Sequence, residues 1–268
     1  MPLHRHPPTR PAAPWRGAAL GVCAGLTFAT VWGAPARWLD SGLRWLTHER
    51  VQLHDARGTV WSGSAMLTLT GGPGSRDARS LPTRITWHLA WAWPGLSLTL
   101  SSDCCTPSPL QWQLTVGWNR VDVTWPDPSS TWPMALLTGL GAPWNTLQAE
   151  GLLQWKNTGL HWRWLDGQLH WHGQSELQLH QATSRLSMLR PMGSYRLTLQ
   201  GTESGTTTPQ LALSTLAGPL QLSGQGQWQQ RLRFTGEAMA EPGHEEALSN
   251  LLNLLGQRNG ARTRLSLE

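Results

Sequence analysis

The stretch Leu110-Gln-Trp-Gln-Leu-Thr-Val116 decides how this chain folds. Apolar and polar side chains alternate through it, and the alternation resumes in Val121-Asp-Val-Thr-Trp125. Successive side chains of a strand point to opposite faces, so each stretch predicts a strand with one apolar and one polar face. One-sided strands of this kind are typical of antiparallel sheets.

The same alternation recurs from residue 51 to the end of the chain, in about a dozen segments separated by Gly, Pro, Asp and Ser. We therefore expect a mainly β fold, a curved antiparallel sheet that closes as a sandwich or stays an open trough. Residues 126–143 are rich in Pro and Ser, contain a predicted short helix at 132–140, and mark a possible subdivision.

A second helix is predicted near the C-terminus, in the stretch that begins at His244 and ends at Leu255. Acids occupy its first turn and Gly256 follows its last apolar residue, as the start and stop of a helix require. Its leucines share one face, so we expect it to pack on the sheet, before a last strand over 263–267.

An uncharged run stands near the N-terminus, Gly17 to Ala34. Residues 17–36 reach the length of about 20 residues that a bilayer span needs, so they predict a transmembrane anchor. Arg5, Arg10 and Arg16 precede the run without an acid, which predicts a cytoplasmic segment 1–16. A cleaved signal peptide and a buried core helix are the alternatives.

Two further segments follow from this topology. Residues 37–50 place Leu39, Leu43 and Leu46 at helical spacing and predict a short amphipathic linker. Residues 51–268 are then an exported β-rich domain. Ala34-Pro35-Ala36 has the small residues of a signal-peptide cleavage site, and cleavage there would instead release a soluble exported protein.

The charge distribution argues against a nucleic-acid partner. The net charge is +5, but residues 1–50 hold six arginines against two acids, whereas residues 51–268 hold 15 basic and 14 acidic side chains. The basic excess therefore serves membrane topology rather than phosphate binding. Eighteen Trp stand against two Phe and one Tyr, so Trp fills the large aromatic positions of the core.

The chain lacks the motifs of the common catalytic sites, GxSxG, HExxH, the P-loop and GxGxxG. The best metal candidate is His170 with His172 and His161, which we interpret as histidines on the polar face of a strand. Cys104 and Cys105 are adjacent, and a bond between neighbours closes almost no loop and stabilises little. We expect no enzyme, no metal and no cofactor.

Four stretches together resemble one family. They are Gly58-Thr-Val-Trp-Ser-Gly63, Gly141-Ala-Pro-Trp-Asn-Thr-Leu147 with Gly151 after it, Pro191-Met-Gly-Ser-Tyr-Arg-Leu197, and residues 231–260. In order and spacing, over essentially the whole chain, they resemble type II secretion system protein N. The positions that carry the resemblance are Gly58, Trp61, Gly63, Gly141, Trp144, Asn145, Gly151, Gly193, Tyr195, Phe234, Gly236, Asn250 and Gly256.

The resemblance implies a single-pass protein of the bacterial inner membrane whose periplasmic domain helps to export folded proteins across the outer membrane. It implies the inner-membrane platform, the clamp protein and the secretin as partners, and no catalytic residues. An AsmA-like or lipopolysaccharide-transport-like lipid carrier or tether is the alternative, because an open trough offers strand edges and an apolar lining.

These motif residues also carry structural expectations. We expect Gly58, Gly63, Gly193 and Gly256 at turns or helix caps. Three aromatic residues of the motifs should be mostly buried with their polar atoms paired, namely Trp61, Trp144 and Tyr195.

Overall fold

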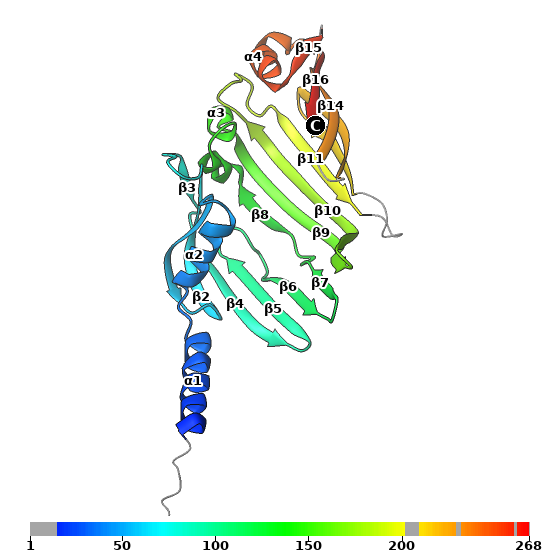
Figure 1. Cartoon of the computed structure of the whole chain (residues 1–268). Helices are drawn as coiled ribbons and strands as arrows, with labels where there is room; N and C mark the ends of the chain where they lie inside the picture. Colours follow the sequence, from blue (N-terminus) through cyan, green and yellow to red (C-terminus); the bar gives the residue numbers. More distant parts are fainter. Residues whose placement is uncertain (1–14, 202–208, 229–231, 260–261, 268) are drawn as a thin grey trace, which may run out of the picture. The chain divides into compact units, whose positions relative to one another are not determined.

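The computed structural model of the chain (Figure 1) describes residues 15–201, 209–228, 232–259 and 262–267. The chain divides into two compact units, Met1–Ala34 and Pro35–Glu268. In the first unit the described residues form helix α1 (Trp15–Trp32), whose side chains over residues 18–32 are exposed. Residues 1–14, most of the predicted cytoplasmic segment, lie outside the described part.

Within the described residues, no helix has both the length and the hydropathy that crossing a membrane would take. The transmembrane span expected over 17–36 therefore stays a prediction. The helix and the uncharged run differ in their bounds, because α1 takes in Arg16 at its start and ends at Trp32, before the predicted end at 36. The exposed side chains of α1 also contradict the alternative of a buried core helix.

The second unit consists of short helices and sixteen described strands. The helices are α2 (Arg37–Leu46), the 3-10 helix η1 (Met134–Leu140), α3 (Trp144–Leu147) and α4 (Glu245–Leu255). The first eight strands are β1 (Val51–Gly58), β2 (Ser62–Thr70), β3 (Ala78–Ser80), β4 (Ile85–Ala92), β5 (Gly95–Ser102), β6 (Leu110–Val116), β7 (Arg120–Thr124) and β8 (Ser130–Pro133). The others are β9 (Glu150–Leu165), β10 (Gln168–Thr183), β11 (Gly193–Gln200), β12 (Gln210–Ala217), β13 (Leu220–Trp228), β14 (Leu232–Ala240), β15 (Gln257–Asn259) and β16 (Arg262–Leu267).

All of these strands belong to one open antiparallel sheet with the order β1-β2-β4-β5-β6-β7-β9-β10-β11-β12-β13-β14-β16-β15. Strand β3 pairs with β2 and strand β8 with β9, beside this path. Figure 1 shows the succession of neighbouring strands from β4 to β11. The mainly β prediction is confirmed, and the open sheet replaces the sandwich alternative. The predicted C-terminal helix and last strand correspond to α4 and β16.

The segment 126–143 is built into this sheet. Strand β9 pairs with β7 along residues 161–165 and with β8 along residues 152–155. The predicted short helix is observed as η1. Between the two pairings, the side chain of Asn157 donates to the carbonyl of Pro126 at 3.1 Å. The segment thus supplies β8 as a further partner of β9, beside β7 and β10.

Two clusters of buried side chains lie at different parts of the sheet. The first includes Leu53, Ile85, Trp87 and Leu136, and Leu39 and Leu43 of α2 pack against it. The second is built from α4 and strands β10, β11, β13 and β14, through Ala182, Met192, Tyr195, Leu220, Ala238, Leu248, Leu251 and Leu252. Helices therefore cover both ends of the strand order, and the amphipathic prediction for 37–50 is confirmed for Leu39 and Leu43, whereas Leu46 is exposed.

Between these clusters one face of the sheet is apolar across many strands. The register aligns Leu98 with Trp112, Val123 with Trp162, and Trp162 with Trp171. Farther along, Leu177 aligns with Leu197 and Leu197 with Leu213. All of these side chains are half-buried. The strand alternation read from the sequence is thus the basis of one continuous, partly covered apolar face.

The outer edge of β1 is covered by the chain that enters the second unit. The backbone N–H of Leu53 donates to the carboxylate of Asp40 in α2 at 2.7 Å, and the N–H of Ala36 donates to the carbonyl of Gly58 at 3.0 Å. Edge strands expose unpaired backbone groups that invite aggregation. The entry segment satisfies part of this edge.

Candidate functional site

The motif 58–63 forms the hairpin between β1 and β2. Gly58 adopts a φ of 89°, and the N–H of Thr59 donates to the carbonyl of Ser62 at 2.8 Å. The indole N–H of Trp87, on β4, donates to the carbonyls of Thr59 and Val60 at 3.2 and 3.1 Å. The motif therefore docks one tryptophan against a tight hairpin.

Gly63 is needed for that docking. It lies within strand β2, so the prediction that it occupies a turn is wrong. A Cβ atom at this position would lie 2.5 Å from the Trp87 ring and 2.5 Å from the carbonyl oxygen of Arg57. The glycine is required by the close approach of Trp87, which is 24 residues away in sequence. Trp61 in the same motif is half-buried.

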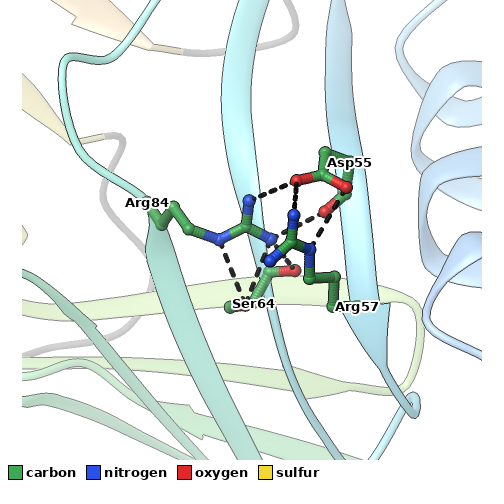
Figure 2. A network of polar contacts seen from close by, with 4 residues as sticks. All are labelled: Asp55, Arg57, Ser64 and Arg84. Carbon is green, nitrogen blue, oxygen red and sulfur yellow. Dashed lines mark hydrogen bonds and ion pairs between the residues drawn. The ribbon is translucent and has the colours of Figure 1, made fainter.

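A polar network lies beside this hairpin, where β1 is bulged (Figure 2). Asp55 has a φ of 50°, and its carboxylate pairs with Arg57 at 2.8 Å and with Arg84 at 2.7 Å. Arg84 also donates to the carbonyl of Asp55 at 2.7 Å and to the carbonyl of Ser64 at 3.0 Å. A bulge leaves backbone groups without ladder partners, and the bond from Arg84 to the Asp55 carbonyl satisfies one in the bulged segment. Hydrogen bonds from Arg57 and Arg84 hold the pKa of Asp55 below its ordinary value.

A shallow depression of about 520 Å³ adjoins the network. Hydroxyl side chains from three strands line it, and so do the guanidinium of Arg57 and the imidazole of His88. The hydroxyl groups are those of Ser62, Ser64, Thr86, Thr99 and Ser101. This set offers hydrogen bonds to a polar or anionic group, so the depression is a candidate site for a hydrophilic ligand or a partner side chain.

A second ion network joins β7 to β9. The buried carboxylate of Asp122 accepts from Arg163 at 2.6 Å, from Arg120 at 2.8 Å and from His161 at 3.2 Å. Burial raises the pKa of Asp122, but the hydrogen bonds from Arg163 and His161 and the attraction of the arginines lower it further, so the net shift is downward. One carboxylate thus fixes the alignment of two strands.

The Asp122 network accounts for the position of one histidine that was considered above as a metal ligand. His161 is engaged by Asp122 and by the hydroxyl of Thr124, and it stands opposite His172 in the β9–β10 register. His170 stands opposite Arg163, whose charge disfavours a cation nearby. In the described part of the chain, no group of three or more potential ligands is placed to hold a metal ion.

The second motif ties two loops together. Gly141 ends η1 with a φ of 79°, and Asn145 donates from its side chain to Asp77 at 2.9 Å. Trp144 begins α3 and is half-buried. Gly151, with a φ of 142°, stands where a Cβ atom would lie 2.7 Å from the carbonyl of His180. These residues fix the course of the backbone where the chain enters β9.

The third motif places Tyr195 in the second core cluster. Gly193 lies at the start of β11, so the prediction of a turn is wrong. A Cβ atom there would lie 2.6 Å from the Tyr195 hydroxyl, so the close approach of that ring favours glycine. Tyr195 is buried as expected, but within the described residues its hydroxyl has no hydrogen-bond partner. The prediction of a paired polar atom is therefore wrong, and burial raises the pKa of this hydroxyl.

The last motif combines an aromatic ring with glycines. The ring of Phe234 lies over Gly224 and Gly236, where Cβ atoms would approach it to 2.3 and 3.1 Å. Gly256 follows α4 in an extended conformation with a φ of 171°. Asn250 is exposed on α4. Apart from Asn250, the motif residues serve the packing of hairpins and caps.

Five tryptophans form a continuous cluster on the apolar face. Trp125 contacts Trp112, Trp155 and Trp162, with ring centroids 6.2, 5.6 and 4.5 Å away, and Trp162 contacts Trp171 at 4.7 Å. Tilted and edge-to-face pairs at such distances stabilise beyond area burial. The cluster joins β6, β9 and β10 across the middle of the sheet.

Cys104 and Cys105 are joined by a disulfide in the loop between β5 and β6. Cys105 is buried in the first core cluster, and its carbonyl accepts from the N–H of Thr131 at 2.8 Å. Cys104 is exposed. The bond closes no loop beyond the two neighbours, in keeping with a local role.

Sequence reasoning missed Asp55, Arg84, Trp87 and Asp122. Asp122 stands between Val121 and Val123, so its position on the polar face was evident, but its partners His161 and Arg163 come from a strand about forty residues later. Arg84 has no sequence signal, because the bulge that it satisfies becomes visible only in the register of β1 and β2.

The structure thus defines a mainly β protein, one open antiparallel sheet with a hydroxyl-lined depression and a half-buried apolar face. The family model described as type II secretion system (T2SS), protein N matches residues 49–266. The chain therefore belongs to the type II secretion system protein N family. Comparison with curated proteins and comparison with solved structures each returned no match.

Proposed function

We propose that this chain is a non-catalytic accessory component of the type II secretion machinery that helps folded proteins leave the periplasm across the outer membrane. One observation carries the proposal: the family match over residues 49–266 coincides with the sheet, which runs from Val51 to Leu267. The part of the chain that matches the family is thus the sheet, and in this proposal the sheet is the part that acts in secretion.

In this proposal the N-terminal segment holds the chain at the inner membrane, with the sheet on the periplasmic side. Exposed apolar side chains along α1, such as Leu26 and Phe28, support attachment to a lipid surface. The three arginines before Gly17 support an N-terminus on the cytoplasmic side. Fractionation with protease treatment of spheroplasts tests this, and a sheet that protease cannot reach would contradict it.

The proposed partners are the inner-membrane platform, the clamp protein and the secretin. The last strand offers a means of contact. Strand β16 pairs with β14 along residues 262–267, whereas β15 pairs only with residues 262–264. Within the described residues, the outer edge of 265–267 is left for a partner strand, which would bind by β-augmentation.

Deletion of the gene, followed by complementation with the full chain, tests the function. We expect secreted enzymes to accumulate in the periplasm of the deletion strain and their release to return on complementation. A cytoplasmic marker controls for lysis. Unchanged release of every secreted enzyme in the deletion strain would contradict the proposal.

A second candidate function, an envelope lipid carrier or tether, is favoured by the half-buried apolar face. A photoreactive amino acid in place of Trp162 would then crosslink to lipid in cells. The matched control replaces Lys156, which is exposed on the polar face next to Trp155. Equal crosslinking at the two positions, or none, would contradict a lipid-carrying face.

A further inference from the structure

The turns of three neighbouring hairpins carry large exposed apolar side chains. They are the β4–β5, β6–β7 and β9–β10 hairpins, whose ends lie on the same side of the sheet in Figure 1. Trp93 in the first turn is 84% exposed, and Trp118 in the second is fully exposed. The exposed residues of these ends, here called the tryptophan rim, are Trp91, Trp93, Val116, Trp118, Trp164, Leu165 and Leu169.

The register brings these residues into one row. Thr115, next to Val116, stands opposite Gly95, Val121 stands opposite both Val116 and Trp164, and Trp164 stands opposite Leu169. Strands β4 to β10 on this path are separated by five spacings of about 4.8 Å, so the rim is about 24 Å long. Monomeric proteins rarely expose a contiguous apolar patch of this extent without an interaction partner.

We propose that the tryptophan rim docks into the interfacial layer of a lipid bilayer, as a membrane contact separate from α1. Four of its seven residues are Trp, whose apolar ring and polar N–H suit the boundary between lipid headgroups and acyl chains. Hairpin turns also leave backbone N–H and C=O groups that must hydrogen-bond to water or to lipid headgroups. A dry protein interface would leave these groups without hydrogen-bond partners.

The charges of the turns are compatible with binding to a lipid bilayer. Asp166 accepts a hydrogen bond from Asn119, so the acid at the β9–β10 turn is engaged within the rim. Arg120 pairs with Asp122 at 2.8 Å and remains half-exposed. The carboxylate at the β9–β10 turn is therefore hydrogen-bonded within the rim, and the rim also carries one arginine able to reach phosphate groups.

The test uses the full chain with Cys23 replaced by Ser, because Cys23 is the free cysteine of the described residues. Trp118→Cys receives an environment-sensitive fluorophore, and Met188→Cys, exposed in the loop after the far end of β10, is the matched control. Vesicles of phosphatidylethanolamine and phosphatidylglycerol are added. We expect blue-shifted emission, quenched by spin-labelled lipid, at position 118 alone.

The control separates rim docking from attachment through α1, which would bring both labels to the vesicle without burying either. Trp91→Ser with Trp93→Ser in the labelled protein should abolish the shift while leaving circular dichroism unchanged, since both side chains are exposed. An unshifted label at 118, or equal shifts at 118 and 188, would overturn the proposal. A shift that needs another secretion protein instead of lipid would also overturn it.

Discussion

The Trp87 indole lies against Gly63, where a Cβ atom would come within 2.5 Å of the ring. Gly63→Ala should therefore destabilise the protein by about 1–3 kcal/mol, as overpacking of a filled core does. Chemical denaturation of the full chain measures this. Gly42→Ala in α2 is the matched control, because no atom lies within 4 Å of its added Cβ. The control should be neutral or more stable by up to about 1 kcal/mol, and equal losses at the two positions would contradict the explanation.

Arg84 should hold the β1 bulge in place. Lysine presents one compact charge instead of a planar fork, so Arg84→Lys loses most of the bonds to Asp55 and Ser64. We expect amide hydrogen exchange over residues 53–58 to become faster, on the order of tenfold. Arg79→Lys, on exposed β3, is the control and should leave exchange there unchanged. A bulge that exchanges at its original rate in Arg84→Lys would mean that the backbone alone maintains it.

Asp122 should make stability depend on pH. Its pKa is lower in the folded chain than in the unfolded chain, so the unfolded state binds more protons at acidic pH. This stabilisation is complete above the unfolded pKa of about 3.9 and is lost as the pH falls through the folded value. Asp122→Asn should remove that part of the pH dependence and cost about 1–3 kcal/mol at neutral pH.

Urea titrations between neutral pH and about pH 3 measure the Asp122 effect. Asp103→Asn, at an exposed position, provides the comparison and should retain the pH profile of the parent chain. If Asp122→Asn keeps the full acid sensitivity of the parent, other carboxylates are responsible for it.

Tyr195→Phe should be tolerated or even stabilising. The hydroxyl is buried without a partner in the described residues, so its removal relieves a desolvation cost of about 1 kcal/mol or more. Tyr195→Ala should instead cost about 3–5 kcal/mol, because the ring fills the second core cluster. Thermal unfolding of the two variants separates these cases, and a large loss in Tyr195→Phe would reveal a bond to the hydroxyl.

Local pattern predicted much of this fold, and non-local pairing decided the rest. Alternation in stretches such as Leu110–Val116 identified strands because burial on one face follows directly from a period of two. The choice between one sheet and a sandwich depends on which strands become neighbours, and alternation carries no information on that. Strand β15 was missed because three residues, 257–259, are too short for a recognisable pattern.

In the candidate sites, too, local sequence motifs were recognised but the contacts made by distant residues were not. The motif 58–63 was recognised as a structural unit, but the reason for Gly63 lies in Trp87, on another strand. Similarly, the cations around Asp122 come partly from β9. At the N-terminus the uncharged run and the observed helix differ in their bounds, because the helix includes Arg16 and ends at Trp32.

Apart from β3 and β8, which pair beside the main path, the strand order of the sheet follows the order of the chain, except that β16 lies between β14 and β15. Each new strand therefore completes its ladder on a strand already made, and few pairings must wait for distant sequence. Loop-closure entropy is small for such steps, so the energetics approach a sum of nearest-neighbour terms. Such a sheet can assemble hairpin by hairpin from β1 onward, with β16 and β15 added last and the outer edge of residues 265–267 still open.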